Sequence, residues 1–164
     1  MSNESIPVEL VGVRIELPTN TPIALLREIG GTRFLPIWIG ANEATAIALA
    51  LEGVEPQRPM THDLLMEVTT ALGARVARIV VTELRDGIFY ADLVLVRDGE
   101  EITISARPSD SIALAARTSA PIFVFPGVLD EAGVEIRDED EENEVARFRS
   151  FLQDVTPEDF GSAG

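Results

Sequence analysis

Cysteine is missing from this sequence, and histidine occurs once, at His62. Without cysteine the chain can form no disulfide bond, no thiol nucleophile and no thiolate zinc site. With one histidine, a single chain cannot build a metal site from two histidines, nor a phosphodiesterase mechanism that needs two. These absences direct attention to the carboxylates and arginines.

Long apolar runs are missing too. No run approaches the roughly 18 residues that a membrane span requires. The first residues, MSNESIPVELVG, lack the basic segment and apolar stretch of a secretory signal. Hydrophobic residues nevertheless make up 46% of the chain, which is enough for a folded core. We therefore expect a cytoplasmic protein that does not enter a membrane.

Positive charge is scarce and lysine is absent. All 13 basic residues are arginines, against 28 acidic residues, and the formal net charge is −15. Such a chain does not attract phosphate backbones over long distances. Aromatic residues are only 5% of the chain, so no platform for stacking single-stranded bases is visible. A nucleic-acid function would need a local arginine patch or a bound cation.

The residue pattern predicts an α+β fold. The segment VGVRIELP alternates between apolar and other residues, as a half-exposed strand does. Gly30-Gly31, Asp86-Gly87 and Asp98-Gly99 are hairpin dipeptides, and Trp38 in the third strand is most simply a core residue. Helices are expected near residues 41–52, 61–72 and 109–118. Together these features predict a curved, largely antiparallel sheet packed by three main helices.

The second predicted helix has an apolar stripe. We expect Thr61 to cap it and its core face to consist of four side chains: Leu64, Leu65, Val68 and Leu72. The polar residues His62, Asp63 and Glu67 fall away from the centre of that stripe. Ser109 is the expected cap of the third helix.

The C-terminal part of the sequence differs from the rest. Residues 1–130 read as one domain, and residues 131–164 as an acidic linker followed by a helix. RDEDEENE is a self-repelling run. After it, apolar residues recur at helical spacing: Val145, Phe148, Phe151, Leu152 and Val155. We predict an amphipathic C-terminal helix at 143–154 that docks on the domain or on a neighbouring subunit.

Two acidic residues of the second helix suggest a metal site. Asp63 and Glu67 lie one turn apart, a spacing that can hold Mg²⁺ or Mn²⁺. His62 precedes them and could act as a general base. The alternative is structural, because the helix dipole favours an acidic residue in a first turn whatever the function.

Two Arg-Pro corners suggest phosphate binding. Arg58 and Arg107 each precede a proline, and each is followed by a hydroxyl residue and an aspartate. In the functional interpretation both arginines, with Ser109, bind phosphate, and Asp110 is a metal ligand and catalytic carboxylate. In the structural interpretation they form well-capped helices. For Glu43, at the start of the first helix, a dipole role and a catalytic role cannot be separated.

Three segments resemble the bifunctional nuclease domain family: LPIWIGANEATAIALALEGVEPQRPMTHDLL, GIFYADLVL and ARPSDSIALAAR with the PIFV that follows. The resemblance covers about residues 8–130, and the C-terminal segment resembles an extension of actinobacterial members. It implies a compact α+β domain, often dimeric, with DNase and RNase activity attributed through plant members. The motif positions carried over are Glu43, Arg58, His62, Asp63, Arg107, Ser109 and Asp110.

Two functions therefore compete. One is a metal-dependent nuclease acting on single-stranded DNA or RNA, with Mg²⁺ or Mn²⁺ as cofactor. The other is a non-enzymatic oligomeric module that binds a partner, which the acidic charge favours. The nuclease interpretation predicts that Glu43, His62, Asp63 and Asp110 converge at one cleft. A homodimer is expected from the sheet edges, the high apolar content and the resemblance.

Overall fold

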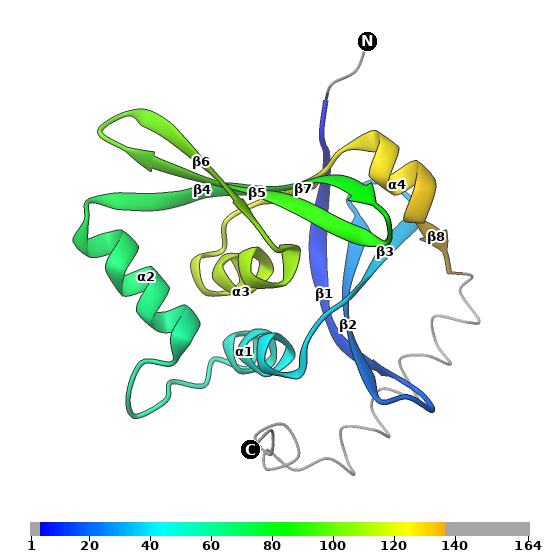
Figure 1. The fold of residues 1–164 in the computed structure, drawn as a ribbon, viewed down its shortest axis with the longest axis horizontal. Helices are drawn as coiled ribbons and strands as arrows, with labels where there is room; N and C mark the ends of the chain where they lie inside the picture. Colours follow the sequence, from blue (N-terminus) through cyan, green and yellow to red (C-terminus); the bar gives the residue numbers. More distant parts are fainter. Residues whose placement is uncertain (1–3, 137–164) are drawn as a thin grey trace.

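The computed structural model describes residues 4–136, which form one eight-stranded sheet with helices against it (Figure 1). The strand order is β6-β5-β4-β7-β1-β2-β3-β8. The strands are β1 Ile6–Glu16, β2 Thr21–Glu28, β3 Arg33–Trp38, β4 Ala74–Arg85, β5 Ile88–Arg97, β6 Glu100–Ala106, β7 Ile122–Val124 and β8 Val134–Glu135. All neighbours pair antiparallel except β4 and β7, which are parallel. The predicted α+β fold with a largely antiparallel, curved sheet is confirmed.

The hairpin signals in the sequence correspond to real turns. Gly30, Gly87 and Gly99 all have positive φ, and so do Asp86 and Asp98. Adjacent residues with positive φ give the turn that matches the twist of two antiparallel strands. The turns at 86–87 and 98–99 thereby join β4, β5 and β6 into one meander.

Three helices of eleven residues lie on one side of the sheet, and a fourth, shorter helix lies near β3 (Figure 1). They are α1 Ala41–Leu51, α2 Thr61–Ala71, α3 Pro108–Thr118 and α4 Pro126–Ala132. The core lies between α1, α3 and the sheet. Ile47 and Ile112 are fully buried there with Ile79 of β4. The alanines of α1 and α3 allow the two helices to pack closely.

The expected core face of α2 is wrong. Leu64, Leu65, Val68 and Leu72 are between 43% and 60% exposed, whereas His62 is only 8% exposed. The helix is rotated relative to the prediction because His62 hydrogen-bonds to Asp110 of α3. The stripe therefore faces away from the core of the described residues.

Three smaller expectations are also corrected. Met60, not Thr61, is the N-cap of α2, because the Asp63 carboxylate accepts a hydrogen bond from the Met60 N–H. Arg107, not Ser109, is the N-cap of α3, since Pro108 already occupies the first turn and Ser109 is buried within it. Trp38 is 54% exposed, and its indole N–H donates to Glu16 at the surface instead of packing in the core.

Two other expectations concern the C-terminal segment and helices that could cross a membrane. The predicted helix at 143–154 and the acidic run before it lie outside the described residues. Within residues 4–136, no helix has the length and apolar character needed to cross a membrane.

We predict that the buried side of α1 contributes much more to the stability of the domain than its exposed side. Ile47→Ala should lower the free energy of unfolding by about 2–5 kcal/mol, because it leaves a cavity between α1 and the sheet. Leu51→Ala, on the same helix but 48% exposed, should cost no more than about 1 kcal/mol. Urea unfolding followed by circular dichroism measures both, and equal losses would contradict this placement of the core.

Candidate functional site

The first turns of α1, α2 and α3 meet at one place through four polar side chains. His62 Nε2 of α2 lies 3.0 Å from Asp110 Oδ1 of α3. Arg107 donates from Nε to Asp110 Oδ2 at 2.9 Å and from Nη2 to Glu43 Oε1 of α1 at 2.8 Å. We call Glu43, Arg107, Asp110 and His62 the helix-end network.

The helix ends explain why these residue types occur there. The residues that precede the helices, Gly40, Met60 and Arg107, are extended, and none caps its helix with a side-chain hydrogen bond. Backbone N–H groups in the first turns therefore favour nearby negative charge. Glu43, Asp63 and Asp110 supply that charge. The position of these acids is thus explained by helix stability alone, and it does not prevent a role in a functional site.

Asp63 belongs to a second, neighbouring pair. Its Oδ1 accepts a hydrogen bond from Arg117 Nε at 2.7 Å, and its Oδ2 accepts one from the Met60 N–H at 3.0 Å. Arg117 also donates from Nη1 to the Ala113 carbonyl at 2.8 Å. Both oxygens of Asp63 are therefore engaged by the scaffold, and the pair fixes α2 on α3.

The arginines keep both aspartates ionised. Burial raises the pKa of Asp110, but hydrogen bonds from His62 and Arg107, together with the charge of Arg107, outweigh this effect and lower the pKa below its usual value. The pKa of Asp63 is lowered chiefly by the hydrogen bond from Arg117. Hydrogen bonds to Asp110 and then Glu43 raise the pKa of Arg107.

Access to the network is uneven. The Arg107 side chain is 65% exposed, whereas the side chains of Glu43 and His62 are 14% and 10% exposed. An incoming anion would therefore meet Arg107 first. The two acids hold its guanidinium in place, and the imidazole contacts one of them, Asp110.

The other predicted site residues do not take part in this network. Arg58 is exposed and, within residues 4–136, makes no ion pair; Glu67 is exposed on α2; Ser109 is buried in the first turn of α3. The predicted metal ligands Asp63, Glu67 and Asp110 do not form a cluster. Among the described residues, no three histidine, aspartate or glutamate side chains lie together so that they could hold a metal ion. The two aspartates are occupied by arginines and His62 instead, so this arrangement does not fit a metal.

Arg117 is the residue that sequence reasoning missed at this site. The available signal was its spacing of seven residues from Asp110, which places both on one side of α3. Its partner on α2 could not be read from that spacing.

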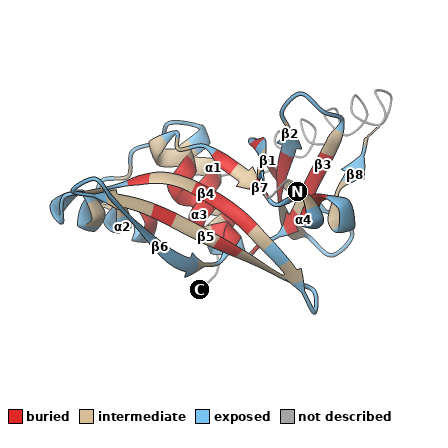
Figure 2. Cartoon of the chain, turned by 90° about the horizontal axis from the view of Figure 1, so that it is seen from above, coloured by how far each residue is buried: buried red, intermediate tan, exposed pale blue. Residues whose placement is uncertain are grey.

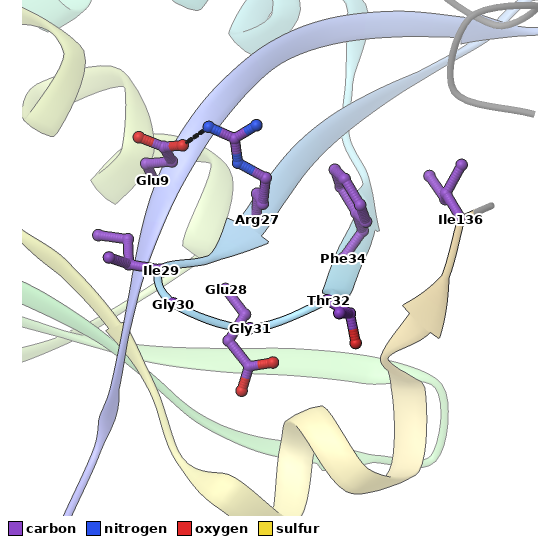
Figure 3. Close-up of a pocket in the computed structure, with 9 residues that line it drawn as sticks. All are labelled: Glu9, Arg27, Glu28, Ile29, Gly30, Gly31, Thr32, Phe34 and Ile136. Carbon is purple, nitrogen blue, oxygen red and sulfur yellow. Dashed lines mark hydrogen bonds and ion pairs between the residues drawn. The ribbon is translucent and has the colours of Figure 1, made fainter. Parts of the chain in front are cut away.

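A separate cavity lies at the turn of the β2–β3 hairpin (Figure 3). It has a volume of about 460 Å³ and is lined by the hairpin from Arg27 to Phe34 together with Glu9 and Ile136. Glu9 and Arg27 form an ion pair across its rim. No residue of the helix-end network lines it, so this cavity and the network are at different places in the fold.

Comparisons with known proteins identify the family of this domain. Residues 24–137 match the family model of the bifunctional nuclease domain, and the chain belongs to that family. Uncharacterized protein Rv1829 of Mycobacterium tuberculosis is 48% identical over 161 residues, covering 93% of this chain and 96% of that protein.

Plant proteins match over the domain. Bifunctional nuclease 1 of Oryza sativa subsp. japonica is 28% identical over 70% of this chain and 35% of that protein. Bifunctional nuclease 1 of Arabidopsis thaliana is 30% identical over 66% of this chain and 35% of that protein. The matched part is thus about a third of the length of these plant relatives.

We predict that the Asp63–Arg117 pair stabilises the fold in a pH-dependent way. Asp63→Asn and Arg117→Gln should each cost about 1–3 kcal/mol at neutral pH, and the double mutant should reveal a coupling of about 1–2 kcal/mol. Because the folded-state pKa of Asp63 is below its unfolded value, this contribution is present above about pH 4. It should disappear as the pH falls through the folded-state pKa.

The Glu83–Arg85 pair is the matched control for this cycle. Its side chains are 48% and 58% exposed, and its atoms are 3.7 Å apart, so its coupling should stay below about 0.5 kcal/mol. Urea titrations at several pH values measure both cycles. A coupling at Asp63 that is no larger than the control, or that persists at acid pH, would contradict the assignment.

Proposed function

We propose that this protein is a nuclease that hydrolyses phosphodiester bonds in single-stranded DNA or RNA at the helix-end network. The observation that carries the proposal is the contact between His62 and Asp110, backed by a largely exposed Arg107. Membership of the bifunctional nuclease domain family supports the reaction class. The names of the plant relatives point in the same direction.

Arg107 is the proposed phosphate-binding residue. A guanidinium has five N–H donors in a planar fork, and the network uses Nε and one position on Nη2. The remaining donors are available for a phosphate oxygen without breaking the network. Glu43 and Asp110 hold the guanidinium plane, so little side-chain entropy is lost when the phosphate binds.

His62 is the proposed general base. The ionised Asp110 carboxylate accepts a hydrogen bond from the Nε2–H of His62. Nδ1 is then the ring nitrogen that can accept a proton. A water molecule attacks phosphorus, its proton moves to Nδ1, and the phosphorus–oxygen bond to the leaving group breaks. The leaving oxygen takes a proton from solvent, and the Asp110 carboxylate stabilises the charged imidazole.

A dependence on Mg²⁺ or Mn²⁺ stays a prediction. The described carboxylates do not form a metal site. The roles proposed for His62 and Arg107 do not need a metal ion. An assay with each metal, and with chelator in place of metal, tests this point separately from the roles of His62 and Arg107.

Two observations favour the second candidate function, a non-enzymatic binding module. Both arginines near the site, Arg107 and Arg117, are already paired with carboxylates. The chain as a whole also carries a net charge of −15, which opposes nucleic-acid binding. A partner with basic groups would match such a surface, and the activity assay decides between the two functions.

We predict that purified protein cleaves single-stranded DNA or RNA and that His62→Asn and Asp110→Asn lower turnover about 10²-fold or more. Arg107→Ala should weaken substrate binding and reduce its salt dependence. Glu83→Gln, at an exposed carboxylate on β4, is the control and should cleave like the unmutated protein. Melting temperatures of all variants separate lost chemistry from lost folding.

The outcomes distinguish the interpretations. If Glu67→Gln also abolishes cleavage and activity requires divalent metal, the metal interpretation with Glu67 as ligand gains over the histidine mechanism. If the unmutated protein shows no cleavage above a mock preparation, with or without metal, the nuclease proposal fails and the binding module is favoured.

A further inference from the structure

The outer side of α2 carries apolar side chains that the described domain does not cover. Leu64, Leu65, Val68 and Leu72 are 53%, 43%, 48% and 60% exposed. The inner side of the helix is used by His62 and Asp63, which contact α3. Rotating α2 to bury the leucines would therefore break the contact of His62 with Asp110.

The edge strand β6 is also exposed. It is the first strand in the sheet order and pairs only with β5, and Figure 2 shows it in the colour of exposed residues along most of its length. Its seven residues contain no proline, its pairing with β5 has no register shift, and its charges are confined to Glu100 and Glu101 at its start. Proline, bulges and charges along an edge strand prevent pairing with another chain, and the rest of β6 has none of them. At the opposite edge, β8 has only two residues.

The exposed isoleucines of β6 lie on the helix-bearing face of the sheet. Ile104 is opposite Leu93, which is opposite the buried Ile79 of the core. Side chains directly opposite each other across strands lie on the same face, so Ile104 and Ile102 point to the side that carries α3. They are 44% and 42% exposed.

The two exposed regions lie at the same end of the sheet. α2 leads through Gly73 into β4, whose first residue, Ala74, pairs with Arg97; Arg97 in turn pairs with Glu100, where β6 begins. Figure 1 shows α2 and the start of β6 at this end. Their six apolar side chains expose on the order of 500 Å², which is the size of the largest, often functional, apolar patches on monomers.

We propose that a second copy of this chain covers this surface, with β6 pairing antiparallel to β6 of the second copy about a two-fold axis at Thr103. In that register Ile102 lies opposite Ile104 of the second copy, and Ile104 opposite its Ile102. Each copy therefore supplies the partner that the other lacks, as a two-fold interface requires. Aliphatic pairs directly across two strands stabilise the pairing.

Charge does not oppose this register. Glu101 lies opposite Ser105 of the second copy, so no two carboxylates face each other. Arg78 already neutralises Glu101, donating to its two oxygens at 2.7 and 2.9 Å. The exposed apolar area of about 500 Å² is more than half of the roughly 800 Å² per partner of a standard interface, and the backbone groups of β6 add hydrogen bonds.

The chain after Ile136 is the competing occupant, because residues 145–155 include an apolar stripe. It starts next to β8, at the opposite edge of the sheet from β6. A second copy can reach β6 without crossing the sheet, and its own β6 can pair with the whole strand. This difference favours the second copy.

A single cysteine tests the register directly, since the chain has none of its own. Thr103→Cys should give a covalent dimer on mild oxidation, or with a short bis-maleimide linker, because the two thiols meet at the axis. Ile88→Cys is the matched control: it is 57% exposed, lies at the β4–β5 hairpin and should not cross-link. Sedimentation should show a dimer for the unmutated protein and a monomer for Ile102→Glu, with circular dichroism confirming that the variant folds.

Three results would overturn the proposal. One is an unmutated protein that sediments as a monomer at every concentration. Another is equal cross-linking of the two cysteine variants. The third is a Thr103→Cys protein that cross-links only after residues 137–164 are removed, since that would identify the C-terminal segment as the occupant of the surface.

Discussion

The contact between His62 and Asp110 is the constraint on which much of this structure depends. A buried imidazole needs a polar partner, because an unpaired buried polar group is costly. Asp110 supplies that partner from the first turn of α3, 3.0 Å away. The contact fixes the rotation of α2, and with it the direction in which the leucines of α2 point. One hydrogen bond thus connects the candidate site to the exposed apolar surface.

The helix starts and Arg107 explain why acids accumulate in a region proposed to bind an anion. Glu43 and Asp110 lie in first helical turns, where the dipole favours them. Each also holds one donor of Arg107. The acids therefore serve the scaffold and the positioning of the guanidinium together. A net charge of −15 does not prevent such a site, because one oriented and exposed arginine acts locally.

Much of the architecture was predictable from local sequence. Asp86-Gly87 and Asp98-Gly99 specify tight turns through their backbone preferences alone, and the structure has both turns. The helices also begin and end within a few residues of the prediction. Helix rotation was not predictable in the same way. The pattern Leu64, Leu65, Val68 indicates an apolar face but does not say whether the domain itself or another surface buries it.

The sequence by itself determined the secondary structure, the hairpin turns and the lack of cysteine chemistry, since these depend on residue identity and short-range spacing. It also placed Glu43, His62, Arg107 and Asp110 at helix starts. Only the tertiary structure decided that they meet in one network, whereas Asp63 turns to Arg117 and Glu67 remains apart. Those contacts join residues up to 64 positions apart, and local preferences cannot encode which distant partner a carboxylate will meet.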